Sequence, residues 1–317
     1  MIVAVALVVG ALVAGWLVPR VLTHADLRHR DPRALLSAWL LSMSGVLLAG
    51  TVGILLLFIP EHGTAGSLAT ALNGCWTALQ HGTSPKLEEL GGVASVIMLL
   101  AGAIRLAVVG LGEIRRVRRT RRDHLALLRL AGRAGAGRPR TLWLAHDEPM
   151  AFSIAGRPGV IVATDGLTRH LPSACAAAVL AHEQAHLRGH HHLLVGLAEV
   201  LRRTVPFVPL FRQAPTAIRD LVELSADEAA ARRHGPAAVR AALLGVTGHG
   251  VPDGALAIAG DAVALRLARL DRWNESGSAR RALACGAAGI VATTLPFVTG
   301  GALLLTAAIA ACPIGVQ

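Results

Sequence analysis

The sequence is poor in aromatic, charged and cysteine residues. It has no tyrosine among 317 residues and an aromatic fraction of 3%, which argues against the stacking platforms that bind single-stranded nucleic acids. Only 16% of the residues are charged, whereas soluble domains average about 25%. The four cysteines form no C-x-x-C pair, so they predict neither a cysteine zinc site nor a disulfide framework. With 53% hydrophobic residues, the composition indicates a membrane protein.

Long apolar runs dominate what is present. A membrane helix needs about 20 mostly apolar residues, and four stretches meet or approach this length. They are residues 2–18, 34–59, 91–112 and 282–311. The first run is followed by Arg20 rather than preceded by positive charge, which favours an uncleaved anchor over a secretory signal. We therefore expect a mainly α-helical integral membrane protein with about four transmembrane helices.

The arginines predict the orientation of these helices, because Lys and Arg are enriched in short cytoplasmic loops. Residues 19–33 contain four arginines, residues 60–90 contain no arginine and one lysine, and residues 115–122 contain six arginines. We expect a multi-pass protein of the cell membrane, with its N-terminus and the loop 60–90 outside. Lipid headgroups attract such an arginine run beside a span. No DNA-reading motif accompanies the run, so we expect no direct nucleic-acid partner.

These patterns divide the chain into three regions. Residues 1–114 form a three-span region, residues 115–281 a cytoplasmic α+β domain, and residues 282–317 a C-terminal transmembrane helix. In the middle region we expect strands at 141–145 and 160–163 and helices at 125–136, 174–187 and 216–233. Residues 193–211 are mostly apolar but contain two arginines and two prolines, so we expect a helix and loop that lie against the membrane.

The strongest chemical signal is the sequence His-Glu-Gln-Ala-His at residues 182–186. On a helix, His182 and His186 share one face, where two imidazoles can bind one metal ion. Glu183, beside the first histidine, can act as the general base toward a metal-activated water. The spacing predicts one Zn²⁺ per chain in a hydrolytic site.

Further residues are candidates for the same site. A catalytic zinc takes three protein ligands and leaves a position for water, and we expect Glu223 to be the third. Asp227, one turn later, can hydrogen-bond the free nitrogen of a ligand histidine. His190, His191 and His192 follow Gly189 and are poorly placed as ligands of the same ion. His234 is a weaker candidate for assisting an oxyanion.

A substrate chain also needs a binding surface. The β-branched run Val160, Ile161, Val162 and Ala163 predicts a strand, and we expect this strand to offer an edge to which a peptide backbone can add.

The motifs resemble those of gluzincin-type integral-membrane metallopeptidases. The shared segments are 149–152 (PMAF), 159–167 (GVIVATDGL), 179–186 (VLAHEQAH) and Glu223-x-x-Ala226-Asp227. The three spans, zinc domain and further span look more like the β-lactam-sensing antirepressor peptidases, as does the segment 206–212 (PFVPLFR). The related family of the CAAX prenyl protease and the membrane heat-shock protease is the alternative. Few residues follow the last predicted span, so we expect no penicillin-binding sensor domain.

The resemblance implies a zincin-like domain and a zinc endopeptidase acting on a cytoplasmic or juxtamembrane protein, such as a transcriptional repressor, in regulated proteolysis. Membrane quality control or CAAX-type processing is the alternative within the same class. A non-catalytic membrane scaffold that keeps a metal for signalling is an alternative of another class. Closed structural zinc sites need a fourth protein ligand, which the sequence does not supply, so catalysis is preferred. Membrane lipid is the other expected partner, and the sequence does not indicate an oligomeric state.

Overall fold

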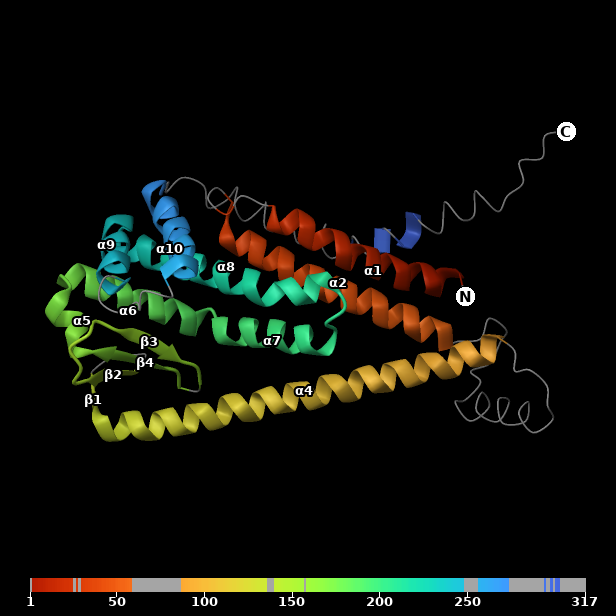
Figure 1. Cartoon of the computed structure of the whole chain (residues 1–317), viewed down its shortest axis with the longest axis horizontal. Coiled ribbons are helices and arrows are strands. Elements are labelled where there is room, and N and C mark those ends of the chain that lie inside the picture. The colour runs from red at the N-terminus through yellow and green to blue at the C-terminus, as the bar shows by residue number, and fades with distance from the viewer. Residues whose placement is uncertain are drawn as a thin grey trace.

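The computed structural model describes residues 2–24, 27, 30–58, 87–135, 140–156, 158–247 and 256–273, with 294, 297, 298 and 300–302. Helices α1 (Ile2–Thr23) and α2 (Pro32–Phe58) occupy one end of the molecule, a small sheet with shorter helices occupies the other, and α4 (Leu87–Ala131) runs along the length of both (Figure 1). The mainly helical fold with a small sheet agrees with the predicted class.

Three described helices are long and apolar enough to cross a membrane. Their candidate spans are Val3–Thr23, Pro32–Leu57 and Val93–Leu128, which support a membrane protein and overlap the first three predicted spans. The fourth predicted span and the loop 60–90 lie almost wholly outside the described residues.

The helix α4 is longer than the predicted span. It continues without a break through the arginine run to Ala131, because no Gly or Pro after Gly112 interrupts this helix-prone segment. The prediction of helix at residues 132–134 was wrong, since Gly132–Ala134 form strand β1, and residue 136 lies outside the described residues.

The sheet contains four strands in the order β1-β2-β4-β3. Strand β2 (Arg140–Leu144) lies parallel to β4 (Val160–Thr164), and β3 (Ala151–Ile154) lies antiparallel to β4 on its other side. All five residues of β4 are buried, as expected for an apolar run covered on both faces. The edge-strand prediction for Val160, Ile161, Val162 and Ala163 was therefore wrong. These residues form a central strand, and the edges are β1 and β3.

Several of the remaining helices begin next to a proline or end at a glycine. The remaining helices are α5 (Asp165–His170), α6 (Ser173–Arg188), α7 (His191–Thr204), α8 (Pro209–His234), α9 (Pro236–Thr247) and α10 (Leu256–Asp271). Helix α6 follows Pro172 and ends at Gly189. Helix α8 has Pro209 at its start and ends at Gly235, whose φ is +83°. Helix α8 is thus longer than the predicted 216–233, because it begins at Pro209, which is tolerated in the first turn, and continues through Pro215 inside the helix.

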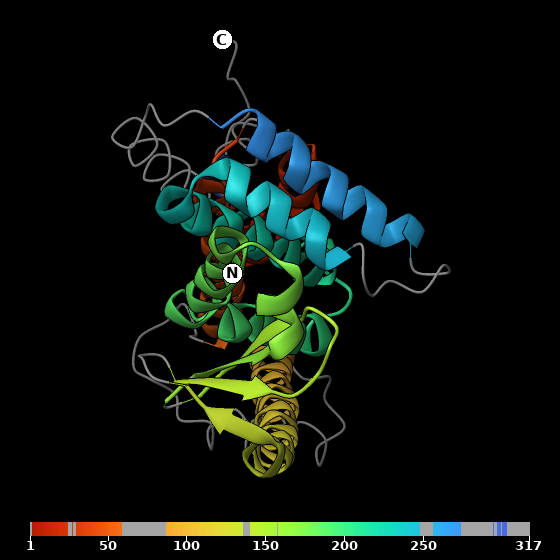
Figure 2. The same ribbon diagram turned by 90° about the vertical axis from the view of Figure 1, so that its left-hand side faces the viewer.

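Two apolar cores divide the length of α8. The first core joins the beginning of α8 to α1, α2 and α7, with Trp39, Met43 and Phe211 almost fully buried. The second joins the end of α8 to α5, α6, α9 and α10, with many small side chains such as Ala178 and Ala230. The sheet lies between α6 and the far end of α4 (Figure 2). The predicted boundary near residue 114 thus marks a change in composition, since the first core crosses it.

Candidate metal centre

Helices α6 and α8 bring the predicted polar residues together. His182, Glu183 and His186 come from the last turns of α6, and Glu223 and Asp227 come from the second half of α8. The two helices pack through buried alanines, including Ala178 and Ala230. Small side chains allow a close approach of the helix axes, so histidines of one helix can meet carboxylates of the other.

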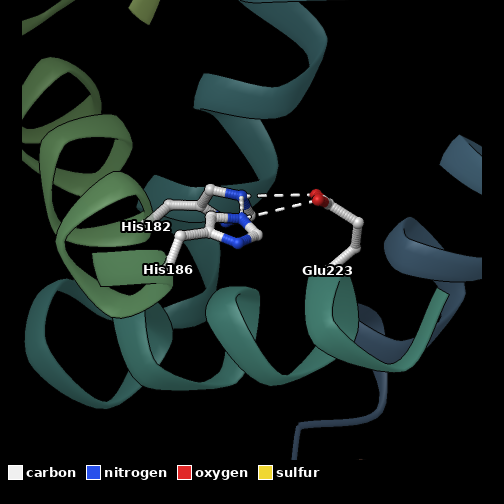
Figure 3. Close-up of side chains that lie close together, drawn as sticks. All are labelled: His182, His186 and Glu223. Atoms are coloured by element: carbon white, nitrogen blue, oxygen red, sulfur yellow. Dashed lines mark hydrogen bonds and ion pairs between the residues drawn. The ribbon is translucent and has the colours of Figure 1, made fainter. Parts of the chain in front are cut away.

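The ligand atoms converge on one point (Figure 3). The Nε2 atoms of His182 and His186 lie 3.0 Å apart, and each lies 3.4 Å from an oxygen of the Glu223 carboxylate. One ligand atom from each residue fits within a group of 4.8 Å. Zinc–nitrogen and zinc–oxygen bonds of 2.0–2.2 Å in a tetrahedron imply separations of about 3.3 Å between ligand atoms. The donor set and its spacing therefore fit a zinc ion.

His182 is fixed by a carboxylate that is itself held. Its Nδ1 lies 2.9 Å from Asp227, whose two oxygens accept hydrogen bonds of 2.6 and 2.7 Å from Arg266. Burial disfavours a charged imidazole, but hydrogen bonds to Asp227 and Glu223 outweigh it and raise the pKa of His182 to about 9. Because ligand histidines must be neutral, metal binding here would release a proton. Asp227 thus lies where the sequence predicted a partner for a ligand histidine.

His186 has a different partner, which the sequence analysis did not assign. Its Nδ1 lies 3.0 Å from Nδ1 of the buried His191. His190 adopts the left-handed conformation with φ of +49°, so the chain turns sharply and α7 begins with His191 facing back toward α6. A Cβ at Gly189 would overlap the His191 ring. The glycine that ends α6 is therefore also required by the close approach of His191.

The charges around His186 favour its neutral form. Burial, together with the positive charge of His182, lowers the pKa of His186 to about 4. Burial also lowers the pKa of His191 to about 4. In a neutral pair one Nδ1 donates and the other accepts. When Nδ1 of His186 is the donor and Nδ1 of His191 the acceptor, the Nε2 of His186 carries a lone pair directed at the cluster. His191 thus sets the tautomer that a metal ligand needs.

Glu183 lies between the cluster and strand β3. Burial raises the pKa of the Glu183 carboxyl, and hydrogen bonds from the side chain and the backbone of Ser153 act in the opposite direction. The N–H of Thr164 donates to Met150 at 3.0 Å, and bonded pairs alternate along an antiparallel ladder. The N–H of Ser153 therefore points away from β4, toward the free edge of β3. This edge, rather than β4, faces the site.

The structure does not bring His234 to the cluster. It is the last residue of α8, eleven residues beyond Glu223 and therefore about 16 Å further along the helix axis. An imidazole cannot reach an oxyanion at the cluster from there. Ser153 and His191 are the residues that the sequence analysis missed, and the segment 149–152 that it singled out for resemblance leads into β3.

A comparison with protein families gives a match over the middle of the chain. The model described as Peptidase family M48 matches residues 115–216, about a third of the 317 residues. The match includes His182, Glu183 and His186 and ends before Glu223. This family includes the CAAX protease and the membrane heat-shock protease, the alternative in the sequence analysis, and the resemblance to the antirepressor peptidases stays a prediction. No solved structure matches the chain. The family match supports a zinc metallopeptidase.

Proposed function

We propose that the chain is a membrane-embedded zinc endopeptidase that cleaves a cytoplasmic or juxtamembrane protein. The observation that carries the proposal is the convergence of His182, His186 and Glu223, with the half-buried Glu183 beside them. Two imidazoles and one carboxylate leave a fourth tetrahedral position for water or substrate, as catalytic zinc sites do. Among the described residues, no fourth protein ligand joins this group.

The residues divide the chemistry among them. Zinc, when bound, supplies a Lewis acid and lowers the pKa of water. Glu183 is placed to accept a proton from the attacking water and to return it to the leaving amine, and burial raises its pKa toward the range where both transfers are efficient. Asp227 and His191 keep the two imidazoles in the tautomers that direct Nε2 at the cluster.

The free edge of β3 is the proposed docking site for the substrate backbone. A peptide adding to this edge would extend the sheet by main-chain hydrogen bonds, and Ser153 on that edge already contacts Glu183. Met150, which precedes β3, and Phe152, within it, are 39% and 43% exposed, and such exposed apolar side chains suit contacts with alternate side chains of an extended peptide.

The biological setting has two candidates. Regulated proteolysis of a repressor is the first, because the arrangement of spans and the segment 206–212 resemble antirepressor peptidases. Membrane quality control or CAAX-type processing is the second, and the match to Peptidase family M48 favours it. We place the metal centre on the cytoplasmic side, with the N-terminus outside, on the distribution of arginines between the loops.

The variant Glu183→Gln tests the catalytic proposal. It removes the base but leaves all three ligand residues in place, so we expect retained zinc and lost proteolysis. The matched control is Glu148→Gln, the same change at an exposed glutamate. Zinc content is measured by mass spectrometry and proteolysis with the purified protein in lipid vesicles. Full activity of Glu183→Gln would remove this residue from its role, and a metal-loaded but inactive wild type would indicate the non-catalytic scaffold.

The same variant separates the two settings. An inactive enzyme that still binds substrate retains its target, so membranes containing Glu183→Gln are solubilised and the captured proteins identified. Capture of one soluble DNA-binding repressor supports signalling. Capture of many misassembled membrane proteins, or of prenylated C-termini, supports the second setting.

A further inference from the structure

We propose that the hairpin formed by α7 and α8 enters the lipid bilayer from the side of the metal centre and ends near the middle of the membrane. Its partner there is the acyl chains of lipid. The proposal rests on the membrane placement of α1, α2 and α4 that the proposed function assumes. It predicts how far the metal centre lies from the membrane surface, and therefore how far from the membrane the scissile bond of a substrate lies.

Contacts with the apolar helices define how far the hairpin reaches. A Cβ at Gly15 of α1 would lie 2.6 Å from the side chain of Val208, and 3.8 Å from Val46 of α2. Val208 precedes α8 and is 3% exposed. Gly15 lies eight residues before the end of α1, about 12 Å along its axis, and Val46 lies fourteen residues into α2, about 21 Å from its start. The tip of the hairpin is thus level with the middle of both helices.

Helix α4 gives an independent measure of the same depth. The guanidinium Nη2 of Arg105 donates to the carbonyl of Arg203 at the end of α7 at 2.8 Å. Arg105 lies ten residues before Arg115, the first of the arginine run, which corresponds to about 15 Å along α4. The hydrocarbon core of a bilayer is about 30 Å thick. Contacts with α1 and α4, and the position of Val46 of α2 beside Gly15, therefore place the tip roughly halfway through it.

The exposed side chains of the hairpin suit lipid. Phe207 at the tip is 70% exposed, and Leu193 and Leu197 on α7 are 68% and 49% exposed. At the same level, the apolar segment of α4 exposes Ile104 and Val108 by 62% and 65%. The two elements pack against each other, so the apolar surface continues from the candidate span onto the hairpin. A soluble loop would not favour three large apolar side chains in water.

The charged side chains near the end of α7 pair with one another and with α4. Glu199 accepts hydrogen bonds from Arg202 and Arg203 at 2.7–2.9 Å. Arg203 also lies 3.4 Å from Glu113 of α4. Charged groups at membrane depth are tolerated when they pair with one another or with backbone carbonyls. Both kinds of partner are found between α4 and α7. Arg203 pairs with Glu113, and Arg105 donates to the backbone carbonyl of Arg203.

The length of α8 then determines the depth of the metal centre. Glu223 is fifteen residues beyond Val208, about 22 Å along a helix that continues through Pro215 and runs roughly parallel to α1 and α2 (Figure 1). With the tip about 15 Å inside the hydrocarbon, the cluster lies within about 10 Å of the membrane surface. The preferred scissile bond is therefore juxtamembrane, next to a span or a lipid anchor of the substrate.

Spin labels measure this depth without requiring catalysis. In a background with the four cysteines replaced by alanine, one nitroxide is attached at Phe207→Cys, and the full chain is reconstituted into phosphatidylcholine–phosphatidylglycerol vesicles. Matched labels go to Val108→Cys, in the apolar part of α4, and to Leu127→Cys, beyond its arginine run, because both residues are 65% exposed. Collision rates are measured with oxygen, which concentrates in lipid, and with a water-soluble nickel chelate.

We expect the oxygen-to-nickel collision ratio at Phe207 to match Val108 and to exceed that at Leu127 several-fold. A ratio at Phe207 equal to that at Leu127 would place the tip in water and overturn the proposal. If Phe207→Cys fails to bind zinc or to fold, Leu197→Cys carries the label on the same hairpin, with an intermediate ratio expected and a ratio equal to Leu127 contradicting it. Lost proteolysis in Glu183→Gln is a separate readout, so the two proposals can fail independently.

Discussion

Two clusters of charged side chains lie between pairs of helices in this molecule, and they differ in how their carboxylates are partnered. Between α4 and α7, Glu113 and Glu199 each accept hydrogen bonds from arginines. Between α6 and α8, the nitrogen and oxygen atoms of His182, His186 and Glu223 approach one another at 3.0–3.4 Å. In the first cluster each carboxylate is paired with arginines, whereas the second brings three atoms that can bind a metal to one point.

The difference shows what makes a metal site out of ordinary residues. Lone pairs that face one another are unfavourable unless a cation or a proton lies between them. The metal centre holds this arrangement because outer partners fix each imidazole, Asp227 on one side and His191 on the other. The arginine cluster lacks such imidazoles and is complete without a metal.

The largest expected effect follows the loss of a ligand. Glu223→Gln replaces a carboxylate by an amide and should weaken zinc binding by more than about 100-fold, beyond the 10–100-fold typical of outer partners. Proteolysis should disappear with the metal. Zinc affinity is measured by competition with chelators of graded strength, with Glu148→Gln as the control. Unchanged affinity would show that the third ligand is another residue.

Removal of the Asp227 carboxylate should have the second-largest effect on stability and zinc binding. Asp227→Ala removes the two short hydrogen bonds of Arg266, whose side chain is 20% exposed, and leaves it only the 3.5 Å approach to Glu223; breaking a buried pair typically costs about 3–5 kcal/mol. Asp227→Asn retains an oxygen that can accept from His182 and should lose much less. Thermal unfolding and zinc titration of both variants provide the measurement. Equal behaviour of the two variants would contradict a role for the acceptor oxygen.

The imidazole partner should matter somewhat less. His191→Ala frees the ring of His186 and should lower zinc affinity by about 10-fold, while a neutral partner leaves no buried charge behind. His191→Asn, whose side-chain oxygen can accept from Nδ1 of His186, should restore most of the affinity. An alanine variant with wild-type affinity would reduce His191 to a packing residue.

The smallest effect is expected in the arginine cluster. Glu199→Gln removes one partner from two half-exposed arginines, a loss that lowers the unfolding temperature by no more than about 4 °C. Zinc content and proteolysis should stay at the wild-type level. A loss of zinc in this variant would show that the metal centre depends on the arginine cluster, contrary to the expectation that the two are independent.

The sequence was most informative where chemistry and periodicity coincide. The motif at 182–186, Glu223 and Asp227 were all identified before the structure, because two helices with fixed periods determine which residues share a face. The three described candidate spans were likewise readable from apolar length. Pairwise spacing along one helix is a local property, which is why these parts were accessible.

The misses have tertiary causes. Strand β4 was identified as a strand, but its central position depends on β3, a four-residue strand whose short run carries little periodicity. His191 was set aside because Gly189 ends α6, and only the left-handed conformation of His190 turns it back toward His186. Helix α4 is 45 residues long and is continuous. Composition alone suggested a membrane span followed by a separate basic segment.

The contact between Ser153 and Glu183 has one more consequence. The outward N–H of Ser153 donates to the Glu183 carboxylate, yet a peptide that adds to β3 needs main-chain donors on that same edge. One N–H cannot serve both acceptors at full strength. In the proposed enzyme, arrival of the peptide would therefore displace Glu183 from Ser153 and free its carboxylate for the water. Glu183 would then be free to accept a proton from water only while a peptide occupies the edge of β3. In the empty site its carboxylate would stay bound to Ser153.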